Sequence, residues 1–213
     1  MRTGVAGNGT IVRRFLKDAA QVEDVRTTAI CVRERSREKG EELAREYGMK
    51  VYTDYEAFLR EGDMDTVYVG LINTQHYPYA KQALLAGKHV ICEKPLTETA
   101  AQARELADLA REKNLFLWEA FKLPYGSILP AVKEHVKELG PVRVVQCNSA
   151  SRAVLCLGGE ETEIACQPEK GSLKPEIQAF ARQLQTGDRT PCYEMLKHSV
   201  QVMEILDDLN NSL

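Results

Sequence analysis

Residues 3–12 read TGVAGNGTIV, and this stretch decides which fold the sequence predicts. Residues 3–6 form a short apolar run that is typical of a buried strand. From residue 11 onward the apolar side chains recur at helical spacing instead, since Ile11, Phe15 and Ala19 share one face. A strand that passes through a glycine-rich loop into a helix predicts the first unit of an α/β sheet.

Outward from this stretch, short apolar runs alternate with helical segments up to about residue 120. Further strands are expected at residues 27–32, 51–52, 66–71, 89–92 and 115–118. The helices between them include one capped by Asp54, one over residues 77–86 and one that opens with the capping box Thr99–Gln102. Strands separated by helices pair in parallel through right-handed crossovers, so this alternation predicts a doubly wound α/β domain over residues 1–120.

Gly7 and Gly9 have the spacing of a loop that cradles phosphates. Gly7 permits a tight turn, and Gly9 lets the backbone approach a pyrophosphate closely. The helix that follows offers unpaired N–H groups and the positive end of its dipole. Val12 stands where such fingerprints have a third glycine, which weakens the match. The loop still predicts a dinucleotide site made by Gly7, Asn8, Gly9, Thr10 and Ile11.

The end of the second predicted strand discriminates between NAD and NADP. An acidic side chain there would bind the ribose 2′-hydroxyl, whereas an arginine would bind a 2′-phosphate. The sequence has Arg33 followed by Glu34 and Arg35. We expect Arg33 to bind the cofactor and to favour NADP(H) over NAD(H). Glu34 leaves NAD(H) open as the ribose acceptor, and both arginines could also be solvated charges in front of a helix.

The pattern changes in residues 121–213. We expect a helix at residues 127–139, a strand at 142–147, an irregular stretch at 150–172 and two final helices at 174–185 and 192–209. One strand cannot form a sheet alone. This half therefore predicts an incomplete α+β domain for substrate binding or oligomerisation.

The most specific motif is Glu93-Lys94-Pro95, which follows the predicted strand at residues 89–92. Together with the segments LINTQH at residues 71–76 and AGKHV at 86–90, it resembles the Gfo/Idh/MocA oxidoreductases. This family includes glucose–fructose oxidoreductase, inositol dehydrogenase and dihydrodiol dehydrogenase relatives. The resemblance covers residues 1 to about 152 and the last two helices, and it implies a Rossmann cofactor domain.

The resemblance implies a role for each residue of this motif. Lys94 would be the catalytic residue beside the nicotinamide, where an ammonium polarises a carbonyl or assists proton transfer. Glu93 would contact the nicotinamide ribose region. The Lys94–Pro95 bond would be cis and would aim Lys94 into the cleft.

Other positions match the family's cofactor and substrate segments. Asn73 and His76 would line the cofactor, and Lys122 is a weak candidate for a substrate contact. Without the resemblance, His76 reads as a helix-start residue and Lys94 as a surface lysine. The open antiparallel sheet of the family and its helix with a catalytic Asp or His are not found, as if roughly 100 residues were absent.

The composition narrows the function classes further. The 213 residues contain 28 Lys and Arg against 31 Asp and Glu, a formal net charge of −3. This balance excludes a broad basic surface for nucleic acid or an anionic membrane. No apolar run approaches the roughly 20 residues that span a bilayer. The N-terminus enters a strand at once and the six cysteines form no C-x-x-C pair, which predicts a cytoplasmic protein with reduced thiols and no metal site.

These patterns together predict an NADP(H)- or NAD(H)-dependent oxidoreductase that moves hydride between nicotinamide and a carbinol carbon of a sugar, polyol or dihydrodiol. The alternative is a non-catalytic nicotinamide-nucleotide-binding module that kept only the cofactor half. The family resemblance also implies a homodimer or a higher homo-oligomer.

Overall fold

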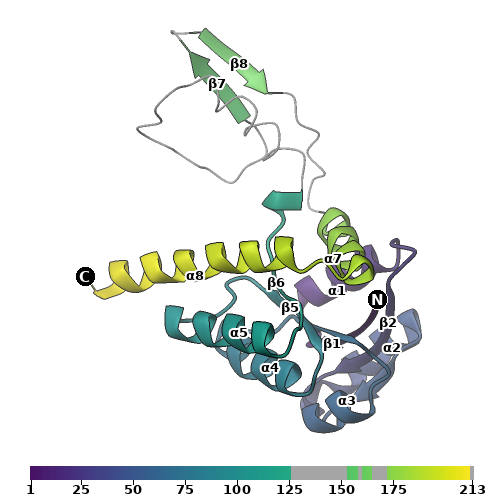
Figure 1. Ribbon diagram of the computed structural model, residues 1–213. Coiled ribbons are helices and arrows are strands. Elements are labelled where there is room, and N and C mark those ends of the chain that lie inside the picture. The colour runs from purple at the N-terminus through teal and green to yellow at the C-terminus, as the bar shows by residue number, and fades with distance from the viewer. Residues whose placement is uncertain (126–152, 158–159, 165–171, 212–213) are drawn as a thin grey trace.

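The computed structural model describes residues 1–125, 153–157, 160–164 and 172–211. Its centre is a six-stranded parallel sheet with the order β3-β2-β1-β4-β5-β6 (Figure 1). The strands are β1 (Arg2–Ala6), β2 (Arg26–Cys31), β3 (Lys50–Tyr52), β4 (Thr66–Val69), β5 (His89–Glu93) and β6 (Leu117–Ala120). The strand order reverses between β1 and β4, and ligands of such sheets bind beyond the carboxyl ends at this point. The predicted doubly wound α/β fold is confirmed.

Five helices connect these strands. They are α1 (Thr10–Ala19), α2 (Arg37–Tyr47), α3 (Tyr55–Glu61), α4 (Asn73–Leu85) and α5 (Ala100–Glu112), with 3₁₀ turns η1 (Glu34–Ser36) and η2 (Leu123–Tyr125). The Asp54 side chain caps α3 by accepting from Ala57 N at 2.7 Å, as predicted. The Thr99 side chain caps α5 by accepting from Gln102 N, also as predicted.

Helix α4 begins earlier than the sequence analysis expected. It starts at Asn73 rather than near Tyr77, so Asn73 and His76 belong to its first turn. Pro78 lies inside the helix. At the sixth position of the helix it lies beyond the first turn, so its missing N–H removes one backbone hydrogen bond of the helix.

The two C-terminal helices share the core of the sheet. Helices α7 (Lys174–Thr186) and α8 (Thr190–Asn211) confirm the two helices expected at the end of the chain. Figure 1 shows α8 running alongside α5, and α7 beside α1. Phe180 of α7 stacks on Trp118 of β6 with ring centroids 5.1 Å apart. Cys192 of α8 lies against the same strand, because its thiol donates to Leu117 O. Residues far apart in the sequence therefore form one hydrophobic core.

The stretch expected to be irregular at residues 150–172 contains two strands. These are β7 (Ala153–Leu157) and β8 (Glu160–Ile164), which pair antiparallel with Leu157 opposite Glu160. The expectation was wrong there because β8 reads EETEI, and a strand this polar is recognised by its partner rather than by its own pattern. The helix expected at residues 127–139 and the strand expected at 142–147 lie outside the described residues.

Three cysteines are described with their side chains, and all three are buried free thiols: Cys31, Cys92 and Cys192. This agrees with the reduced thiols that the sequence predicts. Among the described residues, no helix is long and apolar enough to cross a membrane. The same residues contain no group of three or more His, Cys, Asp or Glu side chains placed to hold a metal ion.

Candidate cofactor and catalytic site

The loop between β1 and α1 has the geometry of a phosphate cradle. Gly7 adopts φ +113° and donates its N–H to Cys31 O at 2.9 Å. A Cβ atom on Gly7 would lie 2.4 Å from Gly70 O, so only glycine fits this turn. Gly9 caps α1 without any side-chain hydrogen bond, and a Cβ atom there would meet nothing within 4 Å. The first N–H groups of α1 therefore have no side-chain cap, and uncapped N–H groups at a helix N-terminus can bind phosphate.

Val12 occupies the position of the missing third glycine, and Gly70 compensates for it. The Val12 side chain is fully buried. A Cβ atom on Gly70, after β4, would lie 2.6 Å from Val12 Cγ2. The absence of a side chain at Gly70 therefore leaves the room that the Val12 side chain needs between α1 and the sheet.

The residues after β2 include one ion pair, between Arg37 and Glu34, and an arginine, Arg33, that lies outside it. Arg37 binds Glu34 through two hydrogen bonds, Nε to Oε1 at 2.8 Å and Nη2 to Oε2 at 3.1 Å. The hydrogen bond from Arg37, more than that from Thr53, lowers the pKa of Glu34 to about 2. Arg33 is exposed, and its side chain makes no hydrogen bond or ion pair with the described residues.

Strand β5 ends in a buried acid followed by an exposed lysine. Glu93 is 8% exposed and accepts from Tyr68 Oη at 2.7 Å and from Lys94 N at 3.3 Å. Tyr68 stacks face to face on Phe15 of α1. Burial, reinforced by the Glu93 carboxylate, raises the pKa of Tyr68 far above its usual value, so its hydroxyl stays a donor. The Lys94 side chain is exposed at the carboxyl end of the sheet.

Two side chains, the buried His76 and the half-buried Glu119, hold the loop that carries Lys94. His76 is 1% exposed, with Nδ1 2.7 Å from Pro95 O and Nε2 3.0 Å from Leu71 O. A neutral imidazole donates from one nitrogen only, whereas the protonated ring would donate to both carbonyls. Glu119 of β6 accepts from Leu96 N at 2.9 Å. The Lys94–Pro95 bond is cis, as the resemblance implied.

The predicted site residues fall into three groups. The ends of β1, β2, β4 and β5 are consecutive in the sheet, and they bring the Gly7–Gly9 loop, Arg33 and Lys94 to one edge. Asn73 lies at the same edge, exposed at the first position of α4. His76 lies beneath the loops, where its ring contacts backbone carbonyls. Lys122, exposed after β6, lies near enough to the buried Glu176 of α7 to lower the pKa of that acid.

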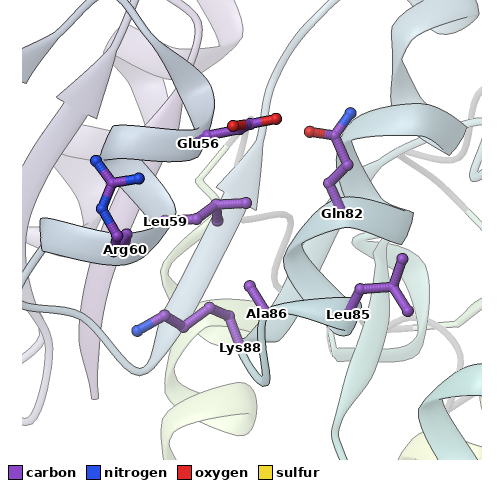
Figure 2. Close-up of a pocket in the computed structure, with 7 residues that line it drawn as sticks. All are labelled: Glu56, Leu59, Arg60, Gln82, Leu85, Ala86 and Lys88. Atoms are coloured by element: carbon purple, nitrogen blue, oxygen red, sulfur yellow. The ribbon is translucent and has the colours of Figure 1, made fainter.

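One hollow in the protein lies away from this edge. It has a volume of about 460 Å³ and is lined by Glu56, Leu59, Arg60, Gln82, Leu85, Ala86 and Lys88 (Figure 2). Lys88 immediately precedes β5 and donates from Nζ to Met64 O at 2.9 Å. The hollow is therefore at the amino edge of the sheet, and it is separate from the predicted cofactor residues.

Sequence reasoning missed several residues that shape the site. Tyr68 and Gly70 were read only as parts of the strand expected at residues 66–71. Glu119 follows the strand expected at 115–118 and Glu176 falls in the helix expected at 174–185, and neither was given a role in the site. Their partners lie on other strands and helices, so local patterns carry no signal for them.

The sequence matches known proteins over its N-terminal half above all. A model of an oxidoreductase family with an NAD-binding Rossmann fold matches residues 1–121. The dTDP-3,4-didehydro-2,6-dideoxy-α-D-glucose 3-reductase of Streptomyces violaceoruber is 36% identical over 174 residues, which are 81% of this chain and 50% of that protein. The chain thus spans about half the length of this relative.

Two solved structures resemble the fold. A 3-ketoreductase from Actinomadura kijaniata, in complex with NADP and TDP-benzene, aligns with a TM-score of 0.61 and 34% identity over 65% of this chain and 42% of that one. Biliverdin reductase from Synechocystis sp. PCC 6803, in complex with biliverdin and NADP+, aligns with a TM-score of 0.79 over 97% of this chain and 96% of that one. At 19% identity, this second likeness shows the fold alone.

Proposed function

Since the chain belongs to the Gfo/Idh/MocA family of oxidoreductases with an NAD-binding Rossmann fold, we propose that it is an NAD(P)-dependent dehydrogenase or reductase. Its substrate would be a sugar, polyol or dihydrodiol, and the hydride would be exchanged with a carbinol or carbonyl carbon of that molecule. The observation that carries the proposal is the shared edge of the sheet, where the uncapped Gly9 end of α1 and the exposed Lys94 both lie. Residues 1–120 would hold the cofactor and residues 121–213 would contribute to the substrate side and to a homo-oligomer.

The residues of this edge fit a nicotinamide dinucleotide. Gly7, Asn8, Gly9, Thr10 and Ile11 would hold the pyrophosphate, because the N–H groups at the start of α1 have no side-chain cap. Asn73, His76, Glu93 and Pro95 would support the nicotinamide end. When bound, the nicotinamide supplies or accepts the hydride.

We favour NADP(H) over NAD(H). Arg33 is exposed and has no ion pair in the described part of the chain, so its guanidinium is available for a 2′-phosphate. Glu34, the rival acceptor for a ribose hydroxyl, is held by Arg37. The Actinomadura reductase was solved with this cofactor.

Lys94 would act on the substrate oxygen. Its ammonium lies at the end of β5, on a loop that His76 and Glu119 hold from beneath. A fixed positive charge stabilises the negative charge that develops on a carbonyl oxygen during reduction, and the same ammonium can donate the proton that the oxygen gains. In the oxidation direction, the neutral amine would accept that proton.

The test is Lys94→Ala, with Lys113→Ala as a matched control on the exposed end of α5. We expect the wild-type protein to bind NADPH more tightly than NADH and to transfer hydride to a member of a panel of ketosugar nucleotides, polyols and diols. Lys94→Ala should lower turnover by about 100-fold or more while changing NADPH affinity by less than about threefold. Full turnover in this variant would remove Lys94 from the mechanism.

A second candidate function is a nicotinamide-nucleotide-binding module without catalysis. It is favoured by the extent of the family match, which ends at residue 121 and so covers the cofactor half. Nucleotide binding by the wild-type protein, with no turnover on any member of the panel, would support this candidate.

A further inference from the structure

Glu176 is a buried acid that no step of the proposed mechanism uses. It lies in the first turn of α7 and is 3% exposed. Its Oε2 atom is buried and has no hydrogen-bond partner among the described residues. A negative charge on this oxygen would have neither water nor a donor to stabilise it, which favours the neutral acid.

Charged and titratable groups from five other segments lie near enough to Glu176 to interact with it electrostatically. They are Asp18 of α1, Tyr68 of β4, Glu93 of β5, Lys122 after β6 and Tyr125 of η2. Burial, and then the nearby Glu93 carboxylate and Asp18, raise the pKa of Glu176 to about 8, and Lys122 opposes this rise.

Glu93 and Glu176 differ in their donors. Glu93 accepts from Tyr68 Oη and from Lys94 N. The Oε2 atom of Glu176 has no donor in the described structure. The neighbouring Asp18 is also engaged, since it accepts from Leu173 N at 2.6 Å. Of the two glutamates, Glu176 is therefore the one whose buried oxygen lacks a donor to stabilise a negative charge.

We propose that Glu176 is a positioning residue of the nicotinamide site: it holds one proton behind Glu93, and its release of that proton favours the oxidised over the reduced cofactor. The proposal rests on the proposed function, which places the nicotinamide beside Glu93 and Lys94. It assigns to α7 an electrostatic role in the cofactor site.

The direction of the effect follows from the charges of the two cofactor forms. The oxidised nicotinamide ring is positive and the reduced ring is neutral, while their phosphates are the same. A new negative charge on Glu176 therefore stabilises only the oxidised ring. We take the distance between the Glu176 carboxylate and the nicotinamide ring to be on the order of 10 Å, with an effective dielectric constant of about 20 to 30. The affinity for the oxidised cofactor relative to the reduced one then changes about five- to fifteen-fold.

The experiment measures the dissociation constants of NADP+ and NADPH between pH 6.5 and 9.5. In the wild-type protein, the ratio of the NADP+ constant to the NADPH constant should fall about five- to fifteen-fold as the pH rises through about 8. Glu176→Gln keeps the shape of the neutral acid and should remove this step. Glu176→Asp should retain a step at a different pH, and the exposed Glu112→Gln should behave as the wild type.

A purely structural role for Glu176 would change stability with pH and leave the affinity ratio flat. A flat ratio in the wild-type protein, or a step that survives in Glu176→Gln, overturns the inference while the proposed function stands. Failure of the wild type to bind either nucleotide overturns both. If Glu176→Gln does not fold, infrared titration of the wild type should show one protonated carboxyl lost between pH 7 and 9.5, and no such loss contradicts the proposal.

Discussion

Helices α1 and α5 both begin beyond the carboxyl ends of strands, but their N-termini differ in whether protein side chains accept hydrogen bonds from the first N–H groups. At α5, the Thr99 side chain accepts from Gln102 N, and Asp207 of α8 accepts from Ala100 N at 2.8 Å. At α1, Gly9 offers no side chain and the N-terminus has no side-chain cap. Unpaired N–H groups of a helix need acceptors. The protein supplies these acceptors at α5 and leaves α1 for an acceptor from outside, as expected for a phosphate.

The largest expected effect is at Gly7, where the open end of α1 depends on backbone geometry. Gly7→Ala places a Cβ atom 2.4 Å from Gly70 O at φ +113°. We expect a loss of about 3 kcal/mol or more in the free energy of unfolding, together with loss of nucleotide binding. Urea denaturation and NADPH titration measure the two effects.

Gly87→Ala is the matched control for this substitution. Gly87 has φ +75°, but a Cβ atom there would meet nothing within 4 Å. The strain of the left-handed conformation alone should cost about 1 kcal/mol, with nucleotide affinity unchanged. Equal losses in the two variants would show that the contact with Gly70 O has no energetic consequence.

The second-largest effect is expected when the N-terminus of α1 is given a side-chain cap like that of α5. Gly9→Asp puts an acceptor at the N-cap, where φ −72° and ψ 179° suit an aspartate. We expect stability to change by only a few tenths of a kcal/mol, because glycine is already a tolerated cap. NADPH affinity should fall about 10- to 100-fold, since the carboxylate occupies the N–H groups and repels phosphate.

Gly9→Asn separates the two causes of that loss. It caps the helix without a charge, so its affinity for NADPH should lie between those of wild type and Gly9→Asp. Unchanged NADPH affinity in Gly9→Asp, measured by titration at low salt, would mean that phosphate does not bind at this end of α1.

The sequence predicted these two helix ends because both depend on neighbouring residues. The uncapped N-terminus of α1 was predicted from a strand that is followed by Gly7, Gly9 and an amphipathic segment. The capped N-terminus of α5 was predicted from the spacing of Thr99 and Gln102. The Asp207 contact at α5 was not predicted, because that residue approaches from the last helix through tertiary packing.

The same limit applies to the candidate site. Lys94 and Glu93 were found from a contiguous motif, and the structure places them at the expected end of β5. Gly70 makes room for Val12, and Glu119 supports the Lys94 loop, but each acts across the sheet on a residue that is distant in sequence. Glu176 shows the limit most clearly, since a glutamate in a first helical turn is favourable on a surface, and only packing shows that it is buried.

The smallest expected effect is at Thr99, and it decides whether the comparison of the two helix ends holds. Thr99→Ala removes one cap of α5 while the hydrogen bond from Ala100 N to Asp207 remains. Loss of a threonine cap costs about 1 kcal/mol of unfolding free energy, and Thr99→Ser should recover most of it. Nucleotide affinity should not change, because this end is already satisfied by the protein. A weaker affinity for NADPH in Thr99→Ala but not in Thr99→Ser would place the α5 end within the cofactor site and make the two ends functionally alike.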